Sequence, residues 1–175
     1  MTGEDFEKTV KAFMDQFTTM TLACSMNDRP WAAPVYYARR NYDLIFFSSP
    51  TSRHSTTLAE NPKASAAIYG SYNDWESIKG LQMEGTVDRI QSPVAITKAL
   101  ATYLKRHSFV KELLKDPRTL SGEILGKTSR VQLYMFRPDR IRYLDNSVGF
   151  GARWMQEILN GEPFGDPLLD QRGAY

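Results

Sequence analysis

Hydrophobic and polar residues alternate along much of this chain with a period of two, which is the pattern of half-buried β-strands. The clearest case is 80–90, where Leu81, Met83 and Val87 share one face and polar residues occupy the other. Gly85 interrupts that strand and indicates a bulge or a close approach by another backbone. Alternation, together with the apolar run at 44–47 and the small side chains at 63–70, predicts seven strands, at 18–26, 31–38, 44–47, 63–70, 80–90, 130–136 and 140–144. A turn at Pro138-Asp139 is expected between the last two.

Three segments have the 3.6-residue period of amphipathic helices instead. They are 4–17, a helix that starts at Pro50 with Ser49 as N-cap and ends before Asn61-Pro62, and a helix from Ser92-Pro93 to about His107. A short continuation at 109–115 is also expected.

Most connections between the predicted strands are too short for parallel crossovers, so the strands must run antiparallel. The fold class is therefore mainly β with flanking helices, as an antiparallel barrel or sandwich. The predicted organisation is one domain over residues 1–160, followed by a loose tail at 161–175 that is rich in Gly, Pro and Asp.

The composition of the 175 residues, 42% hydrophobic and 24% charged, is that of an ordinary globular protein. No apolar run approaches the ~20 residues of a membrane span, and the N-terminus does not have the pattern of a signal peptide. A cytoplasmic location is therefore expected, without membrane association. The net charge of +2 comes from scattered basic residues, which argues against nucleic-acid binding.

A single cysteine and two widely separated histidines argue against a transition-metal site. Cys24 is expected to be a buried structural thiol. Trp31 and Trp75 are expected in the core or at an interface, and His107 is expected to interact with the dipole at the end of its helix.

Polar residues are concentrated where the buried strand 44–47 meets the next helix, in the stretch FFSSPTSRHS. The start of a helix presents free N–H groups and favours negative charge. Hydroxyl groups there could add donors, and Arg53 could bind two phosphate oxygens at once. The residues predicted to bind an anion are Ser48, Ser49, Thr51, Ser52, Arg53 and His54. The alternative is that they serve only to cap the helix.

The surroundings of this joint favour a flat aromatic ligand. Phe46 and Phe47 precede it, the following strand KASAAIYG has small side chains, and Gln82 on the next strand offers an amide. A surface of small side chains with a few amide donors can bind a planar ring.

The order PVYYA, DLIFFSSPTSRHSTTLAENPKASAAI and GLQMEGTV resembles the pyridoxamine 5′-phosphate oxidase-like FMN-binding split barrels. The resemblance covers about residues 10–150 and is most specific in the strand, Ser-Arg, helix and Asn-Pro segment. It implies an antiparallel six- to seven-stranded split barrel that binds FMN between the subunits of a homodimer.

The resemblance also implies roles for individual residues. Phe47 and Ser48 match the pair along the ribityl-phosphate arm, Arg53 and His54 match the basic pair on the phosphate, and Gln82 lies close to a flavin-contacting Gln. The strand with Ala33, Val35 and Tyr36 offers backbone contacts to the ring, and Arg153 or Trp154 reaches the cofactor of the second subunit.

The segment FRPDRIRYLDNSVGFG resembles a branch of these split barrels that has an Asp-Asn and a Gly-Phe-Gly here. In the oxidases proper this region carries a Trp and an Arg-Leu-His-Asp-Arg segment; the Trp position falls near Leu144, and that segment does not exist in this chain. The resemblance implies a flavin-dependent oxidoreductase that acts on an unknown small molecule, and this departure counts against pyridoxamine phosphate as the substrate. Two alternatives stay open: a haem-binding or haem-degrading split barrel with a histidine ligand, and a non-enzymatic module that binds a flavin or another phosphate ligand.

Overall fold

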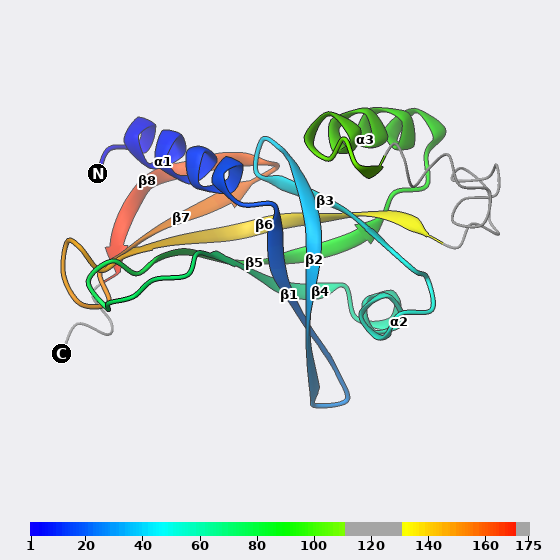
Figure 1. The fold of residues 1–175 in the computed structure, drawn as a ribbon, viewed down its shortest axis with the longest axis horizontal. Coiled ribbons are helices and arrows are strands. Elements are labelled where there is room, and N and C mark those ends of the chain that lie inside the picture. Colours follow the sequence, from blue (N-terminus) through cyan, green and yellow to red (C-terminus); the bar gives the residue numbers. More distant parts are fainter. Residues whose placement is uncertain (111–130, 171–175) are drawn as a thin grey trace.

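The computed structural model of this protein describes residues 1–110 and 131–170 (Figure 1). It contains the helices α1 (Gly3–Gln16), α2 (Arg53–Glu60) and α3 (Pro93–Arg106). The strands are β1 (Thr19–Met26), β2 (Arg29–Arg40), β3 (Asp43–Ser48), β4 (Lys63–Tyr69), β5 (Lys79–Arg89), β6 (Gln132–Asp145), β7 (Arg153–Leu159) and β8 (Glu162–Asp170).

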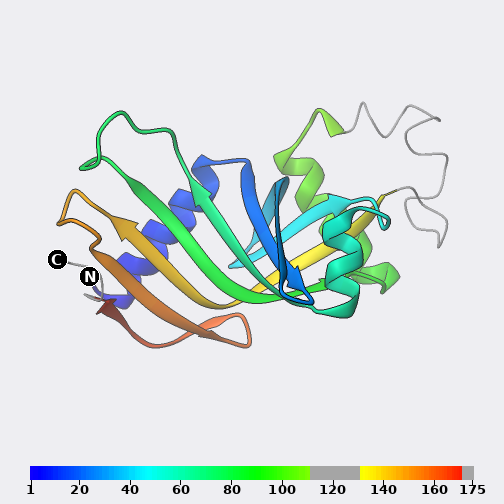
Figure 2. The same cartoon turned by 90° about the horizontal axis from the view of Figure 1, so that it is seen from below.

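The eight strands form a single sheet in the order β3-β2-β1-β4-β5-β6-β7-β8, and every neighbouring pair is antiparallel. An additional pairing between β3 and β6 closes six of the strands into a ring. Strands β7 and β8 extend the sheet beyond that ring. Figure 2 shows the strongly curved sheet with α2 and α3 at one end and the β7–β8 hairpin at the other. The predicted fold class, mainly β with an antiparallel barrel and flanking helices, is confirmed. Strand β7 lies outside the seven predicted strands and was missed.

Two hydrophobic clusters hold the barrel together. The main cluster fills the inside of the ring and includes the apolar stripe of α1, formed by Phe6, Val10, Phe13 and Met14. The second lies on the outside of the ring, where α3 packs on β2, β3 and the first half of β6. As a result, β3 is buried on both faces, which explains the unbroken apolar run Leu44–Phe47.

Helix α2 begins three residues later than predicted. Its N-cap is Ser52, whose side chain accepts a hydrogen bond from the backbone N–H of Ser55, and Ser49 and Pro50 belong to the preceding turn. The sequence offered several good capping residues in a row, and pattern alone did not distinguish them. Helix α3 ends at Arg106, close to its predicted end, and residues 111–115 of the expected short helix lie outside the described residues.

The predicted turn at Pro138-Asp139 is wrong, because β6 continues through it as one strand of 14 residues. The pairing between β5 and β6 shifts register at Glu84/Gly85, so a bulge accommodates the proline. A Cβ on Gly85 would lie 2.0 Å from the carbonyl oxygen of Arg137, which is why this position requires a glycine.

The expectation of a loose tail from residue 161 also differs from the structure. Residues Glu162–Asp170 form β8, which pairs with β7. Asn160 and Gly161 have φ values of 54° and 82° and form the tight turn between the two strands. Two prolines and exposed side chains on both faces hid this strand from pattern analysis, and residues 171–175 lie outside the described residues.

Candidate anion site at the start of helix α2

Strand β3 leads directly into the turn before α2, and Ser48 is its last residue. The side chain of Ser48 is buried, since this residue pairs with Gln132 of β6 and points to the inner side of the ring. The chain then turns through Ser49–Ser52, where the N–H of Ser52 donates to the carbonyl of Ser49 at 3.1 Å. The strand therefore holds the start of the helix at a fixed place on the barrel.

Four polar side chains form a hydroxyl cluster at this joint: Ser48, Ser52, His54 and Ser55. The Oγ of Ser48 lies 2.9 Å from the Oγ of Ser52 and 2.5 Å from Nε2 of His54. Ser55 donates to Ser48 at 3.1 Å, and Ser52 donates to Ser55 at 2.8 Å. A serine hydroxyl has one donor and two acceptor sites, so Ser48 is saturated by these contacts. The hydroxyl cluster joins the end of the strand to the start of the helix, and within it Ser52 caps the helix.

His54 brings no fixed positive charge to this site. Burial lowers its pKa below the ordinary 6.5, so the imidazole is neutral at pH 7. Its Nε2 is already engaged with Ser48.

Arg53 is in a different environment, because its side chain turns outward from the first residue of α2. Its guanidinium carbon lies 4.3 Å from the centroid of the Trp31 ring. Among the described residues it has no carboxylate within ion-pair distance. The adjacent Thr51 is exposed and its Oγ1 lies 2.9 Å from the Oγ of Ser49. The accessible donors at this site are therefore Arg53, Thr51 and Ser49, and these can bind an anion.

The two phenylalanines before the joint are packed away from the surface. Phe46 is fully buried and its ring stacks on Tyr134 inside the barrel, with centroids 5.4 Å apart. Phe47 packs edge-to-face on Tyr103 of α3. The side chains of Ala33 and Val35 are likewise buried, whereas Tyr36 on the same strand is 50% exposed.

Gln82 lies on the outer face of β5, among small residues of neighbouring strands. It pairs with Ala67, which pairs with Thr21, which in turn pairs with Pro34. Directly opposed residues share a face, so these four side chains form one row. Trp31 pairs with the buried Cys24 and so belongs to the inner face. Within one chain, Gln82 and the Trp31–Arg53 pair are thus on opposite faces of the sheet.

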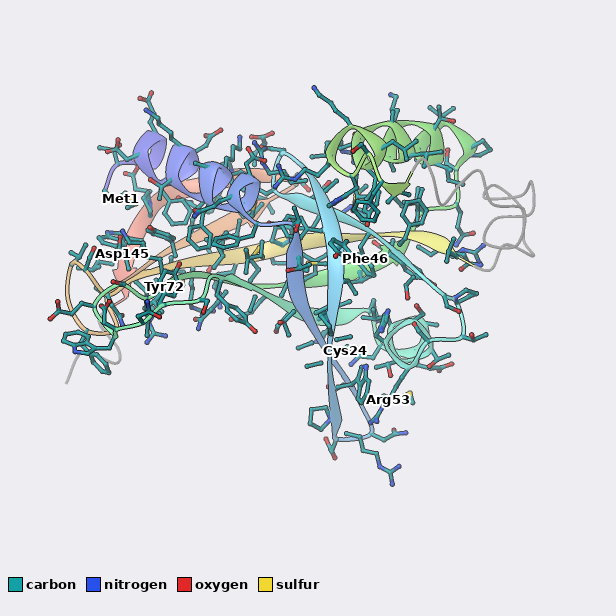
Figure 3. The ribbon with its side chains drawn as sticks, viewed as in Figure 1. Met1, Cys24, Phe46, Arg53, Tyr72 and Asp145 are labelled. Atoms are coloured by element: carbon teal, nitrogen blue, oxygen red, sulfur yellow. The ribbon has the colours of Figure 1, made fainter. Side chains whose placement is uncertain are left out.

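Arg153 and Trp154 are at the far end of the molecule from the anion site. Arg153 pairs with Leu144, the neighbour of Asp145, and Figure 3 places Asp145 and Arg53 at opposite sides of the molecule. Trp154 stacks on Tyr143 at 6.4 Å and packs against the main core. One chain therefore does not bring all the predicted site residues together.

The Asp-Asn and Gly-Phe-Gly residues organise the loop after β6. The side chain of Asn146 donates to the carbonyl of Trp75 at 2.8 Å and accepts from the N–H of Gly151 at 3.0 Å. Asp145 forms an ion pair with Lys79 at 2.9 Å, and hydrogen bonds from Ser147 and this lysine lower the pKa of Asp145 despite its burial. An open cavity of about 770 Å³ lies between this loop and the segment 74–79. These residues join two loops, a role that the sequence signal alone did not reveal.

The stack between Trp31 and Arg53 was missed as well. The two residues are 22 positions apart in the chain, and no spacing rule relates a strand residue to a helix start across that distance. Trp31 and Trp75 are 37% and 51% exposed, so neither is a core residue of this chain, whereas the prediction of a buried Cys24 is confirmed.

Comparison with known proteins agrees with this fold. The chain matches the family described as pyridoxamine 5′-phosphate oxidase over residues 6–143. A UPF0306 protein of Haemophilus ducreyi is 26% identical over 128 residues, covering 71% of this chain and 88% of the relative. A UPF0306 protein of Klebsiella pneumoniae strain 342 is 24% identical over 136 residues, covering 77% of this chain and 81% of the relative.

Two solved structures illustrate the shared architecture. A pyridoxamine 5′-phosphate oxidase-related, FMN-binding protein from Nostoc punctiforme superposes with a TM-score of 0.68 at 12% identity, covering 94% of this chain and 96% of the other. A heme binding protein from Mycobacterium smegmatis gives 0.65 at 20% identity, covering 83% of this chain but only 55% of the other. At such identities the likeness shows the fold and no more. Because the family match extends over most of the residues, the chain belongs to the pyridoxamine 5′-phosphate oxidase family.

Proposed function

We propose that this protein binds FMN and acts as a flavin-dependent oxidoreductase on a small molecule. The observation that carries the proposal is Arg53, an exposed arginine without a carboxylate partner among the described residues, at a helix start in a chain of this family. The name of the Nostoc punctiforme neighbour, which describes an FMN-binding protein, adds support.

The phosphate end of FMN fits the donors at the start of α2. A phosphate monoester carries almost two negative charges, and Arg53 can bind two of its oxygens in the plane of the guanidinium. Thr51 and Ser49 add hydroxyl donors beside it. Ser48 and His54 contribute to phosphate binding only indirectly, because their hydrogen bonds join the strand to the helix.

The ring end of FMN fits the outer-face row formed by Pro34, Thr21, Ala67 and Gln82, in which an amide follows three side chains without charge. Arg53 lies on the opposite face of these strands in the same chain. One ligand therefore needs groups from two chains to be held at both ends, which supports a homodimer with the cofactor between its subunits. Arg153 and Trp154, far from Arg53 in one chain, are the residues proposed to come from the second subunit.

In this function the bound flavin supplies the electron transfer. In each chain Arg53 would bind the phosphate, and the outer face of the sheet would hold the ring. The second subunit would exclude water from the flavin. The proposed location is the cytoplasm. No described helix is long and apolar enough to cross a membrane.

A haem protein is the second candidate, because one structural neighbour is described as a heme binding protein. An axial histidine would usually bind the iron through Nε2, and this atom is engaged in both histidines. Nε2 of His54 is bonded to Ser48, and Nε2 of His107, which is 2% exposed, donates to the carbonyl of Tyr37 at 2.7 Å. The chain has only these two histidines, so the described contacts favour the flavin.

The absorption spectrum of the purified protein tests the proposal. Flavin bands are expected, and a Soret band in their place would favour haem. Binding of FMN should then weaken roughly ten- to a few-hundredfold in Arg53→Ala, since charge-assisted hydrogen bonds are lost.

Riboflavin, which lacks the phosphate, should bind the wild-type protein and Arg53→Ala almost equally. Arg89→Ala, at an exposed arginine at the end of β5, is the matched control and should bind FMN normally. An equal loss of riboflavin and FMN affinity in Arg53→Ala would show that the arginine only supports the fold. Bound FMN that no nicotinamide or other donor reduces would indicate a non-enzymatic flavin module.

A further inference from the structure

Trp31 lies at the start of β2, beside the tip of the β1–β2 hairpin. This hairpin projects from the body of the sheet next to α2, and Arg53 lies beside it (Figures 1 and 3). Burial raises the pKa of the Cys24 thiol, and the positive charge of Arg53 opposes that rise, which agrees with a guanidinium held close to the hairpin. Trp31 is 37% exposed, so burial in the core does not account for its presence.

Several arginines near the sheet have a carboxylate partner, which Arg53 lacks among the described residues. Arg39 forms an ion pair with Asp15, and Arg140 forms one with Glu157 at 2.6 Å. Arg137 and Arg142 have carboxylate partners too. Arg53 instead has an aromatic face as its only partner among the described residues.

A guanidinium that stacks on an aromatic ring keeps its N–H donors, because these lie in the plane of the group and the ring contacts its face. A carboxylate partner would occupy the same donors that a phosphate needs. The Trp31 ring can thus limit the rotamers of Arg53 without competing with an anion. Because the Arg53 side chain is ordered before the ligand binds, binding loses less side-chain entropy.

We propose that Trp31 is a positioning residue for phosphate recognition: its ring holds the Arg53 guanidinium with the donors directed to a phosphate group of the ligand. The phosphate chemistry rests on the function proposed above. The role of Trp31 is additional, and it makes the projecting hairpin part of the binding site.

The first experiment uses inorganic phosphate and does not depend on FMN. The Nε–H resonance of Arg53, assigned by its loss in Arg53→Lys, should be displaced by the ring current of Trp31 and should shift further as phosphate is added. In Trp31→Leu the ring-current displacement should vanish and about three- to tenfold more phosphate should be needed. Trp31→Phe, which keeps an aromatic face, should recover most of the affinity. Trp75→Leu, at a half-exposed tryptophan of another loop, should behave as wild type.

The second experiment is a double-mutant cycle with FMN and riboflavin. Trp31→Leu should weaken FMN binding about three- to tenfold in the wild-type background and leave it unchanged in Arg53→Ala. Riboflavin binding should not change in either background.

Several results would overturn the proposal. Unchanged or tighter phosphate binding in Trp31→Leu would mean that the ring is irrelevant or holds Arg53 away from the ligand. An equal loss in the Arg53→Ala background, or an equal loss for riboflavin, would mean that Trp31 only stabilises the hairpin. If phosphate binding depends on Trp31 but wild-type protein does not bind FMN, the FMN proposal fails while the positioning role stands.

Discussion

The polar residues around the start of α2 divide into two sets with different tasks. Ser48, Ser52, His54 and Ser55 satisfy one another and fix the helix to the strand. Arg53, Thr51 and Ser49 are left with accessible donors. In the first set, Ser52 caps the helix and the other residues bond helix to strand. Anion binding by the second set is our proposal.

Both histidines should make the protein less stable in mild acid. Burial lowers the pKa of His54 and of His107 from the ordinary 6.5, so the unfolded chain binds protons more readily than the folded one. The stabilisation that the two neutral imidazoles provide is complete well above about pH 6.5, and the free energy of unfolding should fall as the pH drops below about 7.

Urea denaturation across this range measures the effect. His54→Gln and His107→Gln, which cannot be protonated, should each reduce the pH dependence. Glu84 and Asp145 have lowered pKa values and lose their contribution only in more acidic solution. A variant in which both histidines are replaced and the slope persists would assign the effect to other groups.

Gly85 is the residue on which the β5–β6 bulge depends. A Cβ there would lie 2.0 Å from a backbone oxygen that cannot move independently of β6. Gly85→Ala should therefore lower the free energy of unfolding by about 3 kcal/mol, as expected for overpacking of a rigid site. Chemical denaturation measures this loss.

Gly3→Ala is the control for this prediction, since a Cβ there would lie 3.9 Å from the nearest atom of another segment, and alanine suits the helix. It should be neutral or slightly stabilising. A Gly85→Ala variant as stable as wild type would show that the bulge can relax.

At the scale of elements, the start of α2 distinguishes two serines that look equivalent in the sequence. Ser52 accepts from the N–H of Ser55, whereas Ser49 precedes the helix by a turn. Ser52→Ala should cost about 1 kcal/mol of stability, the usual value of an N-cap. Ser49→Ala should cost much less, because its hydroxyl contacts only the exposed Thr51 among the residues that the structure describes. Thermal or urea denaturation of both variants, compared with wild type, decides between a start at Ser52 and the earlier start predicted from the sequence.

At the scale of the whole molecule, the proposed homodimer makes a direct prediction. Sedimentation equilibrium should give twice the 20.0 kDa of one chain. Ala32 is exposed on the outer face of β2, so Ala32→Arg should leave a monomer folded but weaken a dimer that uses this face. FMN should be lost together with the dimer.

Lys98→Glu, on the exposed side of α3, changes charge at a surface outside the proposed interface and is the control. A wild-type monomer at micromolar concentration that still binds FMN tightly would contradict the shared site.

The sequence by itself determined the elements whose periodicity is unmistakable. Strands with strict alternation, such as 80–90, and helices with a clear apolar stripe, such as α1, were predicted close to their observed bounds. This is possible because the period of two or 3.6 is imposed locally by which face is buried. The antiparallel fold class followed from the short connections between strands, and the bulge was indicated by a glycine within a strand pattern. The family followed from the resemblance of sequence motifs, and not from periodicity.

Only the tertiary structure decided what depends on contacts between distant segments. Pro138 stays within a strand because Gly85, on the partner strand, leaves room for a bulge. Strand β8 exists because the Asn160-Gly161 turn returns it to β7, although its own pattern is mixed. Trp31 meets Arg53 only because the hairpin and α2 are placed side by side by the barrel, and the same barrel puts Gln82 on the opposite face. Local sequence fixes which face of an element is apolar, but the packing of one element on another decides which polar groups are used internally and which remain to bind a ligand.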